Sequence, residues 1–439
     1  MNFLTTKSLV TIVLALLVAF TSATLIMMNT GDYYRSVFPF IDSIPTFSNN
    51  LPFSYPLKET FSPLDSYEYK SSYSLIVYAY ASLIHLLSNT FSIPLHSSIL
   101  KIFYVIIVSS LFFKVSELED KRILFISYVF CMTPLISSSN LAFFGSFYQE
   151  QVLLIFLPLL LLTVNKRTTE AYLTTFLSIT IIACSKGQFF YFPAIIFCYY
   201  LIYDRKGLFI KIPLVAISLS LSLLCMMFTT STVAYNKYHS VYFGIYEYER
   251  MNGVELPDNA DKNCVGIDSW GNRFDLKSGA VSTSIGEECF NKHKDATFNQ
   301  TIDEILKHPS ILLKLPFDNG VKTQLTENYF HVYKAMPLII NNDGFYAKIT
   351  NVKDALYKNI RFFLLVLALI FSLSFRKDKI SGLIFLCSSL GISQFYISFI
   401  GEGYRDMDKH LFGMNFSFDM AVLIITTSLT SLLNRLKIR

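Results

Sequence analysis

Long apolar runs separated by short polar segments dominate the sequence. A bilayer core is about 30 Å thick, and an α-helix needs roughly 20 mostly apolar residues to cross it. The pattern therefore predicts an all-α polytopic membrane protein with about ten membrane-spanning helices. The expected spans are residues 8–28, 100–115, 123–140, 150–165, 171–186, 189–204, 211–232, 358–375, 380–399 and 417–434.

The first apolar run, from Ser8 to Met28, follows directly after Lys7. It is longer than the apolar core of a cleaved signal peptide, which has about 7–15 residues. We therefore expect this run to remain in the protein as the first membrane-spanning helix.

Basic residues mark one side of the membrane. They gather between the apolar runs, and an excess of Lys and Arg in short loops indicates the cytoplasmic side. All the basic clusters fall on this one side if the apolar segment 71–88, which contains His85, lies flat at the membrane interface instead of spanning the bilayer. Both termini are then cytoplasmic. The clusters are Lys7; Lys114, Lys121 and Arg122; Lys166 and Arg167; Arg205, Lys206 and Lys211; Arg376, Lys377 and Lys379; and Arg435, Lys437 and Arg439.

This topology divides the chain into three parts. Residues 1–232 form an N-terminal transmembrane module, with an exterior loop at 29–96 that includes the flat helix. Residues 233–357 form a large exterior domain, whose charges, glycines, prolines and single tryptophan, Trp270, fit a small mixed fold. Residues 358–439 hold the C-terminal transmembrane helices.

The composition agrees with a membrane protein. Only 16% of the residues are charged and 52% are hydrophobic, whereas soluble domains carry about 25% charge. The net charge of +5 is small, so we expect no nucleic-acid partner. The sequence contains no P-loop, no dinucleotide fingerprint after a strand, and no HExxH or GxSxG motif. Nucleotide-driven transport, and hydrolysis by those routes, therefore have no support.

Two of the seven cysteines differ from the rest in their surroundings. Cys264 and Cys289 lie in the polar segment 233–357, whereas the other five lie in apolar runs and behave as small hydrophobic residues. In an oxidising compartment Cys264 and Cys289 can form a disulfide. The alternative is two free thiols. No cysteine or histidine cluster has the spacing of a metal site.

Ionisable and polar residues gather at the exterior ends of the predicted helices. Charged groups at membrane depth are costly, so they are candidates for function. Together they suggest a site for an anionic, partly lipidic substrate. Lys186 stands out because it occupies a nearly loopless turn between two apolar runs. The set contains Asp32, Arg35, Asp65, Glu68, Glu150, Lys186, Gln188, Glu402, Arg405, Asp408, Lys409, His410 and Asp419.

Several of these residues also have a structural interpretation. Asp32 could be an ordinary loop carboxylate. Glu150 could stabilise the first turn of its helix, where a negative charge is favourable. Lys409 and His410 could extend toward lipid headgroups. His85 fits a structural role better than a functional one.

Two features of the sequence occur together. The first is the order of elements at the N-terminus: a first helix followed by an exterior aspartate, an extended loop, a flat helix and a second span. The second is a set of five short strings: Gly31-Asp-Tyr-Tyr-Arg35, Ser146-Phe-Tyr-Gln-Glu150, Ser185-Lys186, Tyr238-His-Ser-Val-Tyr-Phe-Gly244 and Asp408-Lys-His-Leu-Phe-Gly-Met-Asn-Phe-Ser-Phe-Asp419. This layout resembles the GT-C membrane glycosyltransferases. In size and in its Phe/Tyr/Ile/Lys/Asn-rich composition, the chain is similar to the phage- or island-encoded O-antigen glucosyltransferases that convert serotype.

The resemblance implies an enzyme of the bacterial inner membrane with a site that faces the periplasm. It would transfer a hexose, with glucose expected, from undecaprenyl phosphate or a similar polyprenyl-phosphate carrier. The acceptor would be lipid-linked O-antigen or a related surface glycan, recognised by segment 233–357. The donor, the acceptor and membrane lipid are therefore the expected partners.

The resemblance also implies roles for individual residues. An aspartate at the position of Asp32 removes the proton from the acceptor hydroxyl, and cations stabilise the departing phosphate. The expected phosphate-binding residues are Lys186, Arg405, Lys409 and His410. Asp65 and Glu150 would orient the acceptor or bind a divalent metal, and Arg35, Gln188 and Tyr148 are further expected substrate contacts. The DxD string Asp406-Met-Asp408 leaves a metal requirement open, and no other cofactor is expected.

Two other functions compete with this hypothesis. An O-antigen polymerase also has about ten spans, but it relies on arginines in two exterior loops, for which Arg250, Arg273 and Arg405 are the candidates. The placement of Asp32 and the flat 71–88 helix argue against it. A flippase or transporter often shows inverted repeats and helices broken near the membrane midplane. No repeat is visible here, and the polar residues gather at helix ends, so this function ranks lowest.

Overall fold

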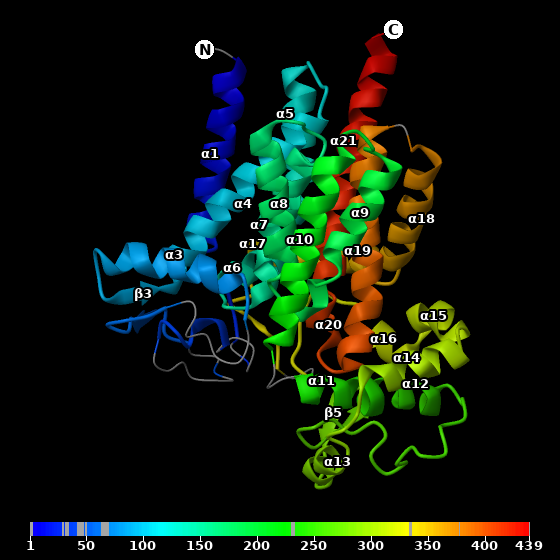
Figure 1. Ribbon diagram of the computed structural model, residues 1–439. Coiled ribbons are helices and arrows are strands. Elements are labelled where there is room, and N and C mark those ends of the chain that lie inside the picture. Colours follow the sequence, from blue (N-terminus) through cyan, green and yellow to red (C-terminus); the bar gives the residue numbers. More distant parts are fainter. Residues whose placement is uncertain are drawn as a thin grey trace.

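The computed structural model describes residues 3–28, 30, 35–41, 48, 51–62, 70–229, 233–332, 336–376 and 378–438. Within these residues the chain is mainly helical. Long helices form a bundle, and shorter helices and strands cover one of its ends (Figure 1). The start of α1 and the end of α21 lie together at the opposite end of the bundle (Figure 1). The two described chain ends are therefore on one side, as expected for termini that share a compartment.

The first half of the chain supplies most of the bundle. Polar residues fix several helix starts by capping, for example Asp120, whose carboxylate accepts hydrogen bonds from the N–H groups of Arg122 and Ile123. The helices are α1 (Phe3–Thr21), α3 (Tyr73–His85), α4 (Ile93–Val115), α5 (Lys121–Met132), α6 (Ser138–Phe144), α7 (Val152–Thr163), α8 (Thr169–Ala183), α9 (Phe192–Ile202) and α10 (Leu208–Met227). Short 3₁₀ helices are η2 (Thr133–Ile136), η3 (Gln149–Gln151) and η4 (Gly187–Phe189).

The second half begins with a mixed region and returns to the bundle. We call residues 233–332 the polar domain; its Cys264 and Cys289 are joined by a disulfide. It contains α11 (Val233–Ser240), the π-helical η5 (Val241–Ile245), α12 (Tyr246–Met251), β4 (Asn272–Asp275), β5 (Gly279–Ser282), α13 (Gly286–Lys292), α14 (Phe298–Lys307), α15 (Ser310–Lys314), η6 (Leu315–Phe317) and α16 (Asn319–Gln324). The bundle then continues with α17 (Phe345–Tyr357), α18 (Arg361–Ser374), α19 (Lys379–Glu402), α20 (Met407–His410) and α21 (Phe412–Ile438).

Three small antiparallel sheets connect distant parts of the chain. β1 (Ile26–Met27) pairs with β6 (Ile339–Ile340), which ties the end of the first helix to the segment before α17. β2 (Ser54–Pro56) pairs with β3 (Thr90–Ser92), and β4 pairs with β5 inside the polar domain. α17 itself packs against α6 and η2 of the bundle.

The number of membrane spans is not settled by helix length. Among the described residues, four helices are by themselves long and apolar enough to cross a membrane, namely α4, α10, α19 and α21. The count rises to six if two bent pairs each form one span. These pairs are α5 to η2 with α6, bent by 62°, and α17 with α18, bent by 70°. The other four predicted spans correspond to shorter apolar helices, α1, α7, α8 and α9, so about ten spans remains a prediction.

The segment expected to lie flat forms α3. In Figure 1 this helix lies below α1, near the lower end of the bundle, and runs across the direction of α1 and not along it. Its first turn is held by the α8–η4 turn, because Ser72 N–H donates to the Cys184 carbonyl at 3.0 Å. This orientation agrees with a flat helix, and its position at a membrane interface stays a prediction.

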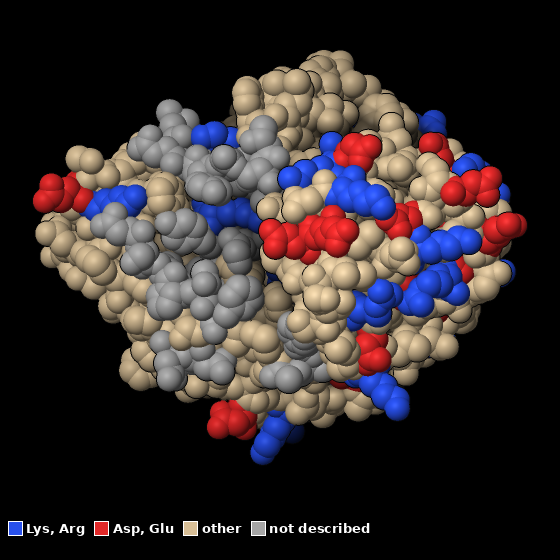
Figure 2. All heavy atoms as spheres, turned by 90° about the horizontal axis from the view of Figure 1, so that it is seen from below, with Lys and Arg blue, Asp and Glu red and all other residues tan. Residues whose placement is uncertain are grey.

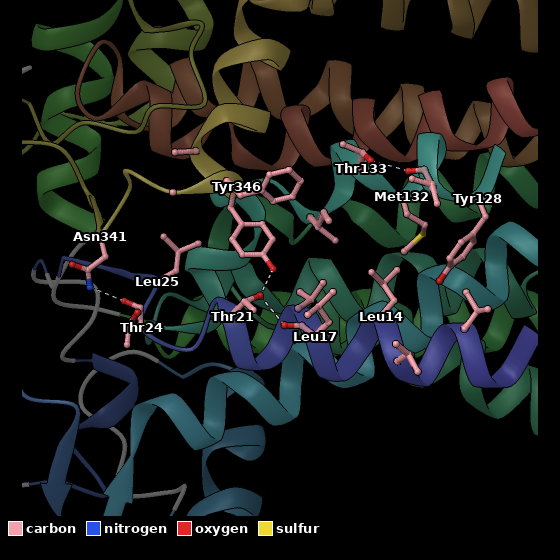
Figure 3. A pocket seen from close by; sticks show the side chains of 18 of the residues that line it. Leu14, Leu17, Thr21, Thr24, Leu25, Tyr128, Met132, Thr133, Asn341 and Tyr346 are labelled. Atoms are coloured by element: carbon pink, nitrogen blue, oxygen red, sulfur yellow. Dashed lines mark hydrogen bonds between the residues drawn. The ribbon is translucent and has the colours of Figure 1, made fainter. Parts of the chain in front are cut away.

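An apolar groove with a volume of about 860 Å³ runs along α1, beside α5 and the start of α17 (Figure 3). Leu14 and Leu17 of α1 line one side and Met132 lines the other. The end of the groove near the polar domain is polar, where Thr21 and Tyr346 share a hydrogen bond of 2.6 Å between their hydroxyl oxygens. The groove therefore has the chemistry of a hydrocarbon-binding surface with a polar mouth.

Candidate functional site

Tyr148 and Gln149 hold the loop that follows α1. The Tyr148 hydroxyl donates to the Met28 carbonyl at 2.7 Å and lies 3.1 Å from the N–H of Thr30. The Gln149 amide donates to the Ser36 hydroxyl at 2.8 Å. The described residues on both sides of segment 31–34 are thus anchored at the start of η3. Arg35 is the sequence neighbour of Ser36, whereas Asp32 and Asp65 lie outside the described residues.

Glu150 and Lys186 form a buried ion pair. The Lys186 Nζ lies 2.6 Å from Glu150 Oε1, and the Glu150 side chain is fully buried. Next to Lys186, the Ser185 carbonyl accepts a hydrogen bond of 2.5 Å from the Ser71 hydroxyl. The pair therefore joins η3, the α8–η4 turn and the start of the flat helix. Both the functional and the structural interpretation of Glu150 remain compatible with this position.

The last loop brings two further predicted residues to the same place. His410 Nδ1 lies 3.3 Å from the side-chain oxygen of Gln188, and His410 Nε2 lies 3.2 Å from a Glu402 carboxylate oxygen. Each ring nitrogen of His410 therefore faces a side-chain oxygen atom. The Lys409 ammonium lies 4.9 Å from the centroid of the Tyr148 ring. α20 thus contacts the η3 and η4 segments of the N-terminal half.

Arg405 is held by the polar domain. Its guanidinium pairs with the Asp268 carboxylate and lies 3.9 Å from the centroid of the Trp270 ring. The structure therefore brings six of the predicted residues into three contacting pairs, and Arg405 lies a few positions before Lys409 and His410 in the last loop. The six are Tyr148, Glu150, Lys186, Gln188, Lys409 and His410.

The DxD string does not present two carboxylates to one ion. The Asp408 carboxylate accepts the N–H groups of Phe330 and Lys409, and burial raises the Asp408 pKa to about 8. The Asp406 carboxylate instead faces His331, with 3.8 Å between Oδ2 and Nε2. Because each acid has separate partners, this pair does not fit a chelating metal site.

One other group of described residues has metal-ligand spacing. It consists of Asp261, Cys264 and His293. The Cys264 sulfur belongs to the disulfide and is not a free thiolate ligand. Neither of these two groups of described residues therefore offers a chelating site for a divalent metal.

A second charged network joins Glu327, near the end of the polar domain, to the bundle and was not expected from the sequence. The Lys353 ammonium lies 2.6 Å from Glu327 Oε2 and 2.6 Å from Asp419 Oδ2. Arg361 also pairs with Glu327, at 2.5 Å, and all four side chains are buried. Of these residues only Asp419 was singled out. Lys353 and Arg361 flank the start of an apolar run, where charged residues ordinarily indicate a loop.

The surface around the site carries mixed charge. Figure 2 shows the molecule from the end that bears the polar domain, with acidic and basic residues interspersed over that domain. Beneath it, the contacts above place lysine, arginine and histidine side chains beside carboxylates. Such a set can bind an anionic group through the cations while a carboxylate orients or deprotonates a hydroxyl.

Comparison with known proteins gives a family but no activity. The chain is similar to a protein of Escherichia coli (strain K12) described as "Uncharacterized protein YfdI". The two are 42% identical over 409 residues, which cover 93% of this chain and 92% of the relative. No solved structure matches the chain. A family model described as "YfdI N-terminal transmembrane domain" matches residues 5–438. The chain is therefore a membrane protein and belongs to the YfdI family.

Proposed function

We propose that the chain is a GT-C-type glycosyltransferase of the bacterial inner membrane. It moves a hexose, with glucose as the first candidate, from undecaprenyl phosphate or a similar polyprenyl-phosphate carrier to lipid-linked O-antigen or a related glycan on the periplasmic face. The observation that carries the proposal is the position of Tyr148. Its hydroxyl contacts Met28 and Thr30, just before Asp32 in the sequence, while Lys409 lies over its ring.

The reaction needs a base for the acceptor hydroxyl and positively charged groups that stabilise the departing phosphate. The acceptor hydroxyl gives its proton to Asp32 and attacks the anomeric carbon of the sugar. The bond from that carbon to the phosphate oxygen breaks, and polyprenyl phosphate leaves with the electron pair. Lys409, His410 and Arg405 supply the positive charge that stabilises the departing phosphate. Glu150 is paired with Lys186, so these two act as one unit that orients substrate.

Two features of the bundle suit lipid-linked substrates. The groove along α1 offers an apolar wall to a hydrocarbon chain and has a polar mouth near Tyr346 (Figure 3). The flat helix α3 begins beside Ser185, next to Lys186. A headgroup at a membrane surface could therefore reach the ionisable residues while its lipid chain stays in an apolar environment.

The test is sugar transfer by membranes that contain the chain, supplied with polyprenyl-phosphate glucose and an O-antigen acceptor. We expect Asp32→Asn to lose about 10²–10⁴-fold of the rate at equal expression, the usual size of a general-base contribution. Asp303→Asn, which changes an exposed aspartate of the polar domain, is the matched control and should keep the wild-type rate. If Asp32→Asn transfers as well as wild type, the base is another residue, with Asp65 and Glu150 next in order.

Two rival outcomes would replace the proposal. If wild type transfers no sugar but alters O-antigen chain length in cells, the chain is a polymerase. The exterior arginines of that hypothesis already have partners, since Arg250 pairs with Glu247 at 2.7 Å and Arg273 donates to the Val265 carbonyl.

A transporter has one specific observation in its favour. The two bent helix pairs meet at the buried network of Lys353 and Glu327, and broken helices often mark transport sites. Movement of a lipid-linked sugar across proteoliposomes without sugar transfer would support that function instead.

A further inference from the structure

We propose that Asp268 and Trp270 of the polar domain position Arg405 for the anionic group of the substrate. The polar domain then has a second role besides acceptor recognition, because it completes the anion-binding site from outside the bundle. The proposal rests on the proposed function only in taking a lipid phosphate as the anion.

The contacts of Arg405 fix the plane and the direction of its guanidinium. Nη1 pairs with Asp268 Oδ2, and the ring of Trp270 covers one face at 3.9 Å. A guanidinium has five N–H donors in a rigid fork. Within the described part of the chain, the Asp268 carboxylate is the one hydrogen-bond acceptor that this side chain contacts. The remaining N–H donors have no acceptor among the described residues, and a guanidinium can bind a phosphate with two parallel hydrogen bonds.

Asp268 is itself held in one orientation. Its Oδ1 accepts the N–H groups of Trp270 at 2.9 Å and of Asn272 at 2.8 Å. The Asn272 side-chain amide donates to both carboxylate oxygens, at 3.1 and 2.9 Å. The next residue, Ser269, donates its N–H to His239 Nε2 at 3.0 Å. Burial lowers the His239 pKa to about 4, so the ring is neutral near pH 7. Because Nε2 accepts the Ser269 N–H, the remaining ring proton is on Nδ1.

Trp270 is supported by a column of aromatic rings. It stacks on Tyr235, with 5.2 Å between ring centroids, and Tyr235 stacks on Phe290 at 4.6 Å. Phe290 follows Cys289, which is joined to Cys264 by the disulfide. A continuous set of contacts thus leads from the disulfide to Arg405. The disulfide stabilises the segment that carries both Asp268 and Trp270.

The backbone before Arg405 is held by close packing and hydrogen bonds with the same domain. Gly403 has a φ of +63°, and a Cβ atom at this position would lie 2.4 Å from the Cα of Gly244, so only glycine allows this contact. The Tyr404 N–H donates to the Phe243 carbonyl at 3.1 Å, and its hydroxyl bonds Asp318 at 3.0 Å. The two residues that precede Arg405 therefore both pack against the polar domain.

These contacts could serve stability alone, so the test must measure binding. Trp270 is the single tryptophan of the chain, and its ring contacts Arg405 directly. Its fluorescence therefore reports on the Arg405 environment without any need for catalysis. The probe is undecaprenyl phosphate, titrated into purified full-length protein in detergent, with undecaprenol, which lacks the phosphate, as the comparison ligand.

We expect a saturable change in Trp270 emission with undecaprenyl phosphate and a much weaker one with undecaprenol. Arg405→Lys should weaken binding at least 10-fold, because lysine lacks the planar fork. Asp268→Asn should weaken it by about 3–30-fold while thermal unfolding in detergent shows a folded protein, and Asp303→Asn should bind like wild type. The double variant Asp268→Asn with Arg405→Lys should bind no more weakly than Arg405→Lys alone, since Asp268 acts through Arg405.

Three results would overturn the inference. They are equal binding of undecaprenol and undecaprenyl phosphate, wild-type affinity in folded Asp268→Asn, or additive losses in the double variant. Binding with the expected pattern in a protein that transfers no sugar would keep this inference and defeat the glycosyltransferase proposal. The two failures are therefore distinguishable.

Discussion

At the scale of single residues, Glu249 shows the effect of burial on a carboxyl group. It lies in α12, is fully buried, and within the described residues neither of its carboxylate oxygens has a hydrogen-bond partner. Glu304 of α14 is close enough to add negative potential. Burial, reinforced by Glu304, raises the Glu249 pKa to about 7. The folded protein therefore holds a proton on Glu249 more tightly than the unfolded chain does.

The sign of the resulting pH dependence follows from linkage. Below pH 4.5, the ordinary pKa of a glutamate side chain, both states are protonated, and the group has no net effect. As pH rises toward about 7, the unfolded chain ionises first, so folding loses stability, and the loss persists at higher pH. We expect Glu249→Gln to gain roughly 1–3 kcal/mol over wild type at pH 8 and almost nothing at pH 4.5.

Thermal unfolding of both proteins in detergent across this pH range measures the effect. Glu255→Gln is the control, because Glu255 is exposed in the same domain and its replacement should leave the pH profile unchanged. A Glu249→Gln difference that does not vary with pH would show that Glu249 ionises normally in the folded protein.

Unusual local sequence context pointed to some residues that the structure places in buried contacts, while their roles in substrate binding stay predictions. Lys186 attracted attention because it occupies a tight turn between apolar runs, and the structure gives it a buried partner in Glu150. Cys264 and Cys289 shared one polar segment, and they are joined. Asp268 and His331 carried no such signal, because they reach Arg405 and Asp406 only through the long-range docking of the polar domain on the last loop.

At the scale of elements, the two broken helices meet at one charged network. The break between η2 and α6 falls at Ser137, and the break between α17 and α18 falls just before Arg361. The Lys353 ammonium lies 3.2 Å from the Ser137 hydroxyl and also pairs with Glu327, which in turn pairs with Arg361. Hydropathy located these apolar runs but not this network, because its charges come together from distant segments.

The network predicts that replacing Lys353 lowers the free energy of unfolding strongly, whereas replacing Lys348 on the same helix changes it little. Lys353→Met would leave the Glu327 and Asp419 carboxylates buried without their shared cation, and we expect a loss of about 3–5 kcal/mol. Lys348→Met is the matched control, because Lys348 is an exposed lysine of α17 and should change stability by less than about 0.5 kcal/mol. Chemical unfolding in detergent gives both values. Equal stability of the two variants would mean that the network contributes little to the fold.

At the scale of the whole molecule, the open question is how many helices cross the membrane. α7, α8 and α9 have 12, 15 and 11 residues, and at 1.5 Å per residue they are shorter than a bilayer core of about 30 Å. The predicted topology places Lys166 and Arg167 on the opposite side of the membrane from Lys186, and in that topology these helices cross. Flanking 3₁₀ turns and interfacial side chains can make up the missing length.

The sides of the membrane on which Lys166 and Gly187 lie decide between these topologies. Lys166 is exposed between α7 and α8, and a side chain at Gly187 in η4 would meet no atom within 4 Å, so both positions tolerate cysteine. In a chain whose five free cysteines are replaced, we expect Gly187→Cys to react with an impermeant maleimide in intact cells whose outer membrane is permeable. Lys166→Cys should react only after the inner membrane is opened, and Asp303→Cys marks the polar-domain side. If α8 crosses, Gly187→Cys and Asp303→Cys share a side opposite to Lys166→Cys, and the candidate site faces the polar domain. Labelling of Lys166→Cys and Gly187→Cys from the same side would remove α8 from the spans and, with it, the ten-span topology.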